Sequence, residues 1–141
     1  MRVVVIGAFA PEYARQYTIL EGLRQCGVEL DLRPFPKTLR APGRLRAVIA
    51  AFPRRGEADA VFIPAFNQLI GPAAYALGRL RGVPVLIDYL VGLNDAADDR
   101  GHTSRTKLMA FTWLDRLNLR RLPALTDTAA HRALFEQLAG R

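Results

Sequence analysis

The residues best placed to do chemistry in this sequence are polar side chains that follow short apolar runs. Asp88 ends the apolar run Val85-Leu86-Ile87, and a carboxylate at the end of a buried strand is costly unless it is paired or used. It could serve as a general base or bind a hydroxyl group, or it could cap a neighbouring loop as a purely structural group. We predict Asp88 as the catalytic candidate and keep the structural alternative open.

A glycine turn, GAFAP at positions 7–11, follows the first apolar run and leads into a helix. Free N–H groups and the helix dipole at such a turn favour binding of an anion. The guanidinium of Arg15 could donate two parallel hydrogen bonds to a phosphate there. Phe9 stands where a dinucleotide-binding fingerprint has its second glycine, so that fingerprint is absent. The turn therefore either binds a phosphate or is an ordinary tight turn with a solvated arginine. Its predicted ligand-binding residues are Gly7, Ala8, Phe9, Pro11 and Arg15.

Three more polar residues follow other predicted strands or lie in the loops beyond them, and we predict that they bind substrate: Asn67, Asp95 and His131. A lone histidine in the first turn of a helix is more often a packing or capping residue than a catalyst. The acidic segment around Asp95 also contains Asp98, Asp99 and His102. Carboxylates spaced in this way are usually solvated, so we expect no metal site and no other cofactor.

The elements that must position these side chains alternate along the chain. Buried or half-buried strands are predicted near residues 3–6, 28–32, 60–63, 85–87 and 125–127, with the second nearer a sheet edge. Helices are predicted after Pro11, from about Gly43, and over 67–81, 104–122 and 128–138, and the polar segment 92–104 is predicted to be a mobile loop. This alternation predicts one α/β domain with a doubly wound parallel sheet, Rossmann-like, and helices on both faces. Ligands of such sheets bind beyond the C-terminal ends of the strands.

Two predicted helices have apolar residues at helical spacing. Tyr13, Tyr17 and Leu20 recur at i, i+4 and i+7 in the first helix, which predicts that they form its buried face. The second helix has an apolar stripe that consists of Leu45, Val48, Ile49 and Phe52.

Positive charge is concentrated around that second helix. The chain has a net charge of +7, and residues 37–55 contain six basic residues and no acidic one. Arginines beside an apolar stripe are typical of a helix that binds an anionic membrane surface. No nucleic-acid-binding module or interleaved stacking aromatics accompany them, so we expect no nucleic acid partner, and ordinary solvated arginines remain the alternative. The predicted membrane-facing residues are Arg40, Arg44, Arg46, Arg54 and Arg55.

The length and composition bound the class of protein. The chain has 141 residues, of which 50% are hydrophobic and 23% are charged, as is typical of one globular domain. No apolar run has the roughly 20 residues of a membrane span. Cys26 is the only cysteine, which excludes an internal disulfide and favours a reducing compartment. We expect a cytoplasmic protein, with peripheral binding to the inner face of the membrane as a further possibility.

Three stretches resemble a known family. VVVIGAFAPEYARQYTILEGLRQCGVEL is similar to the opening of retaining GT-B glycosyltransferases of the large mannosyl- and glucosyltransferase family, DAVFIPAFNQLIGPAAYALGRLRGVPVLIDYLVGLND to their next two strand–helix units, and LDRLNLRRLPALTDTAAHRALF to the end of their N-terminal domain. The resemblance implies that residues 1–141 are this N-terminal, acceptor-binding domain. It also implies sugar transfer from a nucleotide-sugar donor without an obligatory metal.

The resemblance assigns roles to particular residues. The turn from Gly7 to Pro11 would face the donor diphosphate, and Asp88 with the segment around Asp95 would line the acceptor cleft. The sequence departs from the family after Ile87, where many members have a histidine and this chain reads Asp88-Tyr89-Leu90-Val91. We also expect the donor-binding domain to be absent, because the resemblance covers only the N-terminal domain and the sequence reaches no further than Arg141. We therefore expect no activity from this chain alone, and nucleotide-sugar binding only with a separate donor-binding domain or subunit.

Two further hypotheses stay open beside this one. The chain could be a non-catalytic domain that binds a membrane or a protein, or a stand-alone Rossmann-like nucleotide-binding protein. We also expect self-association, such as a homodimer, because large apolar patches rarely stay solvated.

Overall fold

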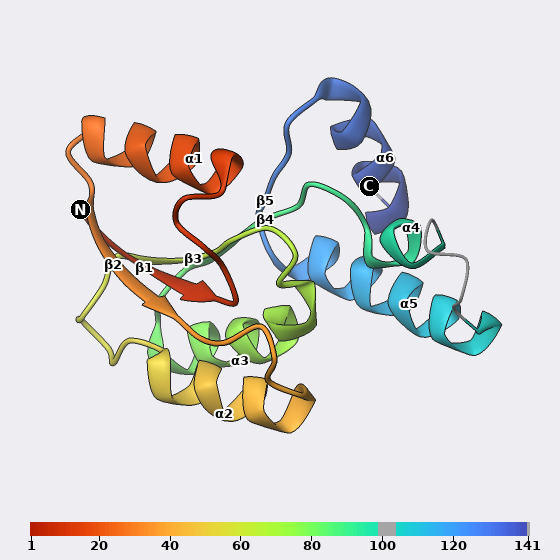
Figure 1. The fold of residues 1–141 in the computed structure, drawn as a ribbon, viewed down its shortest axis with the longest axis horizontal. Helices are drawn as coiled ribbons and strands as arrows, with labels where there is room; N and C mark the ends of the chain where they lie inside the picture. Colours follow the sequence, from red (N-terminus) through yellow and green to blue (C-terminus); the bar gives the residue numbers. More distant parts are fainter. Residues whose placement is uncertain (99–103, 141) are drawn as a thin grey trace.

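The protein folds into one α/β domain around a five-stranded parallel sheet (Figure 1). The computed structural model describes residues 1–98 and 104–140. The strands run in the order β2-β1-β3-β4-β5, and every neighbouring pair is parallel. They are β1 Arg2–Gly7, β2 Glu29–Pro34, β3 Ala60–Ile63, β4 Val85–Asp88 and β5 Ala124–Leu125. The predicted doubly wound parallel sheet is confirmed.

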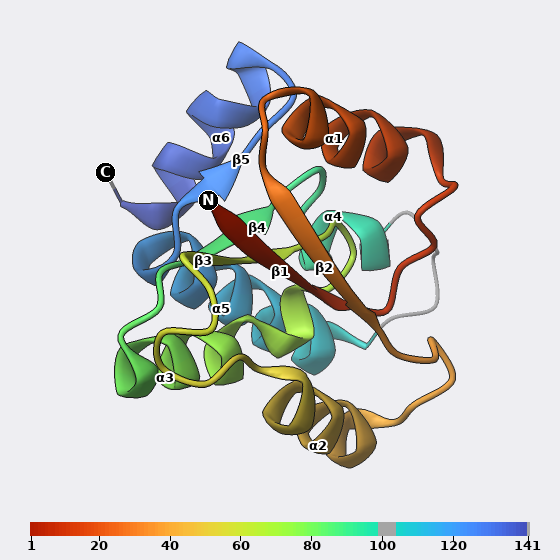
Figure 2. The same cartoon turned by 90° about the vertical axis from the view of Figure 1, so that its left-hand side faces the viewer.

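The helices lie on both faces of the sheet. They are α1 Ala14–Gln25, α2 Ala41–Ala51, α3 Gly71–Arg81, α4 Leu93–Asp98, α5 Arg105–Arg121 and α6 Ala129–Ala139, with a 3₁₀ turn η1 at Gln68–Ile70. Helices α2, α3 and α5 lie on one side and α1 on the other, as Figures 1 and 2 show from two directions. Helix α6 packs against α5, and its buried Phe135 and Ala139 join the core under α2, α3 and α5. No helix in the described parts of the chain has both the length and the apolar character to cross a membrane.

The burial of the central strands explains their sequences. Val4 and Val5 of β1 are fully buried on opposite faces, since Val4 belongs to the core under α2 and α3 and Val5 to the core under α1. A strand covered on both faces needs a continuous apolar run. The half-buried β2 alternates apolar and charged residues because it is the edge strand, as predicted.

The predicted buried face of α1 is wrong by about one position. Tyr13 and Tyr17 are more than half exposed, whereas Gln16 and Leu20 are buried. The two tyrosines do lie on one side of the helix, as their i, i+4 spacing predicts, but that side faces solvent. The buried face of α1 therefore carries a polar residue, Gln16, close to the carboxyl edge of the sheet.

The predicted mobile loop over 92–104 is also wrong in its first half. Residues Leu93–Asp98 form helix α4, which packs against α5 (Figure 1). Asp95 in its first turn places a negative charge at the positive end of the helix dipole, which stabilises this short helix. The remainder of that prediction, including Asp99 and His102, lies outside the described residues.

Candidate functional site

The chain changes direction across the sheet between β1 and β3. It leaves β1 towards β2 and returns to the other side of β1 as β3. Beyond the carboxyl ends of these strands, the segment after β1 therefore leads to one face of the sheet and the segment after β3 to the other. Open parallel sheets bind ligands at such a switch point. A cleft of about 490 Å³ lies there. Its lining residues are Ala8, Phe9, Ala10, Tyr13, Gln16, Lys37, Arg44, Ala65 and Phe66.

Asn67 holds the two turns of this cleft together. Its buried side-chain oxygen accepts a hydrogen bond from the backbone N–H of Ala8 at 2.7 Å. Its amide nitrogen donates to the backbone carbonyls of Pro64 and Ala65 at 3.1 and 3.0 Å. A Cβ atom on Gly7 would lie 2.9 Å from Asn67 Cγ, so the close approach requires glycine there. Asn67 therefore shapes the cleft without lining it.

Phe66 has a strained backbone beside this contact. Its φ is 65°, and it is the only non-glycine residue with positive φ in the described parts of the chain. A bulky residue in this region of backbone space is uncommon and costs energy. The ring is 52% exposed and lines the cleft. Strain that presents an aromatic ring to a cleft indicates a ligand-binding position.

The basic rim of the cleft comes from the segment before α2 and from its first turn. Arg44 is held in place, because its Nε donates to the Leu39 carbonyl at 2.8 Å and its Nη2 to the Lys37 carbonyl at 2.9 Å. The side chain of Lys37 is exposed. Arg44 thus belongs to the cleft, whereas the other four predicted membrane-facing residues, Arg40, Arg46, Arg54 and Arg55, are exposed.

Asp88 and Arg15 form an ion pair a short distance along the same edge. Asp88 is 0% exposed, and Arg15 binds both of its carboxylate oxygens, with Nε at 2.9 Å from Oδ2 and Nη2 at 2.7 Å from Oδ1. The hydrogen bond to Asp88 raises the pKa of the Arg15 guanidinium, so Arg15 is charged throughout the physiological range. The catalytic role of Asp88 stays a prediction, and a base at this position would have to give up a bidentate partner.

Arg15 extends the pair towards the start of α6. Its Nη1 lies 3.9 Å from Asp127 Oδ2, and Asp127 Oδ1 lies 2.6 Å from His131 Nδ1. The hydrogen bond with His131 lowers the pKa of Asp127. Thr128 caps α6 by accepting from the His131 backbone N–H. Asp88, Arg15 and His131, all predicted as site residues, are therefore connected, although His131 does not line the cleft.

The remaining predicted site residues lie apart from the cleft lining. Pro11 is half-buried in the turn before α1. Asp95 is exposed on α4. The described residues contain no group of three or more metal-ligating side chains.

A buried pair on the far side of β4 was not predicted. The Tyr89 hydroxyl donates to Asp115 Oδ1, and Asp115 Oδ2 accepts from the Asn94 backbone N–H at 3.2 Å. Both side chains are buried. Burial raises the pKa of Asp115 and that of Tyr89. The pair connects β4, α4 and α5 behind the carboxyl edge, and neither of its members was among the predicted site residues.

The raised pKa of Asp115 predicts the pH dependence of stability at this site. The folded protein binds the proton more tightly than the unfolded chain, so this contribution to stability is complete below the unfolded pKa and is lost as pH rises through the folded pKa. We expect the wild type to gain stability relative to Asp115→Asn as pH falls from neutral. Urea unfolding of both proteins over an acidic pH series measures this difference. A difference that does not vary with pH, or that shrinks on acidification, would contradict the prediction.

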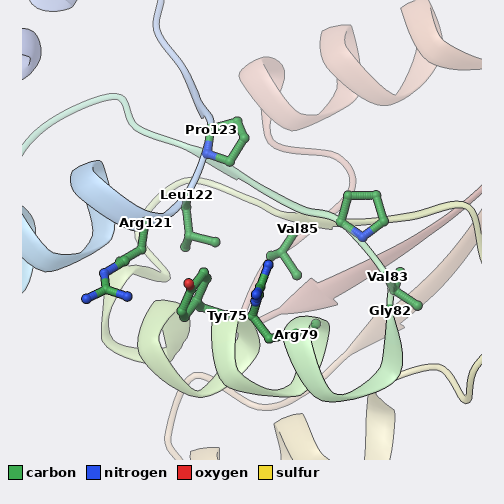
Figure 3. Close-up of a pocket in the computed structure, with 10 residues that line it drawn as sticks. Tyr75, Arg79, Gly82, Val83, Val85, Arg121, Leu122 and Pro123 are labelled. Carbon is green, nitrogen blue, oxygen red and sulfur yellow. The ribbon is translucent and has the colours of Figure 1, made fainter.

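A second hollow of about 320 Å³ lies at the opposite edge of the sheet (Figure 3). Tyr75, Arg79 and Arg121 border it, and the Arg121 guanidinium lies 5.7 Å from the centre of the Tyr75 ring. Helices α3 and α5 end here, and the carbonyl ends of helices disfavour anions. Gly78 at the base of this hollow is required by packing, because a Cβ atom would lie 2.7 Å from the Val83 carbonyl. The carboxyl-edge cleft is the better ligand site.

Gln16, Tyr13, Lys37 and Phe66 of the cleft were not predicted as ligand-binding residues. The position of Gln16, four residues before the apolar Leu20, was a signal that it lies on the buried face of α1, but its polar side chain counted against that interpretation. No family model matches the chain, and no curated protein matches it either. The glycosyltransferase resemblance therefore stays a prediction that rests on the quoted sequence stretches.

Proposed function

We propose that this chain is the acceptor-binding domain of a glycosyltransferase. The single observation that carries the proposal is the cleft at the switch point of the sheet, with exposed rings at Tyr13 and Phe66 and a buried amide at Gln16. Aromatic faces and amide groups are suited to a hydroxylated ring, because the ring packs on the aromatic face while its hydroxyls bond to the amide.

The polar groups at the carboxyl edge of the sheet favour ligand binding without catalysis. The buried carboxylate at the end of β4, Asp88, is neutralised by Arg15. The turn after β1 lacks the glycine-rich phosphate-binding pattern. Transfer would then require a donor-binding domain, supplied elsewhere in the protein or by a partner. The exposed rings and Leu69 at this edge offer apolar surface for such a partner or for a second copy of the chain.

Backbone NMR titration of the ¹⁵N-labelled chain tests the proposal. We expect neutral mono- and disaccharides to shift the amide signals of residues 8–10, 13–16 and 65–67, and UDP, GDP and FMN to bind no more tightly than the saccharides do. Phe66→Ala should weaken saccharide binding by roughly two- to tenfold, the value of a ring contact. Trp113→Ala is the matched control, since Trp113 is an exposed ring on α5 outside the cleft.

The opposite pattern would overturn the proposal. Tight binding of UDP, GDP or FMN by the chain alone, without saccharide binding, would identify a stand-alone nucleotide-binding domain. If the proposal holds, sugar transfer from a nucleotide sugar should appear only after a donor-binding domain is added.

A second candidate function, binding to an anionic membrane, is favoured by helix α2. Leu45 and Ile49 of its apolar stripe are about half exposed, whereas Val48 and Phe52 are buried. The exposed arginines 40 and 46 lie on the same helix or at its N-cap. Co-sedimentation with phosphatidylglycerol vesicles tests this function. It should be lost in Leu45→Ser/Ile49→Ser, and unchanged sedimentation of that variant would exclude α2 as the membrane-binding element.

A further inference from the structure

Gln16, which lines the carboxyl-edge cleft, has a buried side-chain oxygen that accepts no hydrogen bond within the described residues. The residue is 4% exposed, and the oxygen without a partner is Oε1. Buried acceptors are normally paired, so one that is left without a partner needs an explanation.

Local helix capping does not supply that partner. Gln16 is the third residue of α1, where a glutamine side chain often bonds back to the N-cap residue in a capping box. Here the N-cap is Tyr13, which has no short hydroxyl side chain to complete the box, and its backbone N–H donates to the Ala10 carbonyl instead. The oxygen of Gln16 is therefore available to a ligand that donates a hydrogen bond.

The cleft also holds positive charge that no carboxylate balances. Lys37 and Arg44 line it, none of its lining residues is acidic, and neither cation has an ion-pair partner within residues 1–98 and 104–140. Arg44 is fixed through two of its five N–H groups, which leaves the others for an anion. The first turn of α1 has no side-chain cap and no acidic residue, so its dipole adds to the same field.

A ligand that is only an anion, or only a polyol, cannot pair both the two cations and the Gln16 oxygen. An acceptor-only anion such as sulfate would bind the cations but could not donate to Gln16 Oε1. A neutral polyol would donate to Gln16 but would leave Lys37 and Arg44 without a counter-charge. A ligand that carries both a phosphate and hydroxyl groups satisfies both.

We propose that the carboxyl-edge cleft binds a phosphorylated polyol, with the phosphate at Lys37 and Arg44, a hydroxyl donating to Gln16 Oε1, and the carbon skeleton against Phe66. The inference rests on the proposed function, because it names the chemical class of the acceptor. The same chemistry occurs in a free sugar phosphate and in a phospholipid headgroup.

The other buried acceptors without partners lack this setting. Gln68 Oε1 faces no charged group in the hollow of about 240 Å³ that Gln68 lines, where its neighbours include Leu69 and Phe111. Asn118 Oδ1 lies against Gly71, and a Cβ atom there would be only 2.3 Å away. Among the residues that the structure describes, only Gln16 combines an unused acceptor with unbalanced cations.

Calorimetric titration with glucose 6-phosphate, glucose and sulfate tests the proposal, and vesicle co-sedimentation tests its lipid-borne form. We expect glucose 6-phosphate to bind about tenfold more tightly than glucose or sulfate. Binding of phosphatidylglycerol vesicles but not of glucose 6-phosphate would identify the headgroup as the source, provided that Gln16→Met reduces it and phosphatidylcholine vesicles do not bind.

Three variants separate a ligand-binding role from a structural one. Gln16→Met keeps the length of the side chain and removes the acceptor, so we expect about tenfold weaker binding together with a higher urea midpoint. Lys37→Gln should weaken binding and flatten its salt dependence. Lys107→Gln, an exposed lysine on α5, is the matched control and should bind like the wild type.

The outcomes that overturn the inference differ from those that overturn the proposed function. Equal affinity for glucose and glucose 6-phosphate overturns the phosphorylated class and leaves a neutral saccharide acceptor. Unchanged binding of glucose 6-phosphate by Gln16→Met overturns the assignment of a ligand hydroxyl to Gln16. Absence of binding both to glucose 6-phosphate and to phosphatidylglycerol vesicles overturns the phosphorylated class as well. Nucleotide binding without saccharide or sugar-phosphate binding overturns both.

Discussion

Replacement of Arg15 by methionine is expected to lower the free energy of unfolding by about 3–5 kcal/mol. The variant leaves the Asp88 carboxylate buried, at 0% exposure, without the guanidinium that binds both of its oxygens. An uncompensated buried charge costs far more than a surface ion pair contributes. Urea unfolding at neutral pH, followed by circular dichroism, measures the loss.

The double variant Arg15→Met/Asp88→Leu is the control for this prediction. Replacing both members of a buried ion pair by apolar residues is often neutral, so we expect the double variant to recover most of the lost stability. Losses that simply add in the double-mutant cycle would show that the two side chains act independently. Recovery would also make the double variant a folded protein in which a catalytic role of Asp88 can be tested.

Replacement of Asn67 by leucine is expected to cost about 3 kcal/mol or more. Leucine has the same number of side-chain heavy atoms but cannot pair the Ala8 N–H or the carbonyls of Pro64 and Ala65. Each buried group left without a partner costs about 1–3 kcal/mol. Chemical unfolding gives the loss, and the amide signals of Ala8 and Phe66 report whether the cleft keeps its shape.

Asn94→Leu is the matched comparison for that variant. Asn94 makes its hydrogen bond to Asp115 through the backbone N–H, which the substitution retains, so we expect a change within about 0.5 kcal/mol. If Asn67→Leu were as stable as Asn94→Leu, the turn after β1 would not depend on the amide of Asn67.

The sheet could be predicted from sequence because its central strands are covered on both faces. The runs that became β1, β3 and β4 are apolar and are bounded by glycine, proline or aspartate, and burial imposes that pattern directly. The edge position of β2 was readable for the same reason, since its exposure leaves charged residues in alternation. Local sequence was sufficient wherever burial alone determined the residue type.

The candidate site depends on contacts between distant residues, and sequence patterns do not report these. Arg15 and Asp88 are separated by 73 positions and Ala8 and Asn67 by 59. The sequence placed Asp88 and Asn67 at strand ends, where ligands bind, but could not reveal that both are already paired. The positive φ of Phe66 is equally hidden, because phenylalanine carries no propensity for it.

The face of α1 was mispredicted for a related reason. Tyrosines at helical spacing look like a buried stripe, yet here both are exposed, and Tyr13 lines the cleft, where an aromatic ring serves a ligand as well as it serves a core. The buried Gln16 was overlooked because a polar side chain looks like a solvent-facing one when no partner is known. Helix α4 was similarly hidden in a polar segment.

The short last strand limits aggregation between copies of this protein through the edges of their sheets. An exposed sheet edge invites another chain to add a strand, and such edges are a common origin of aggregates. Strand β5 offers only two residues at one edge, and at the other edge β2 carries Glu29, Asp31 and Arg33 and ends in Pro34. Both edges are therefore poor templates for growth into fibrils, and association between copies would have to proceed through side chains at other surfaces.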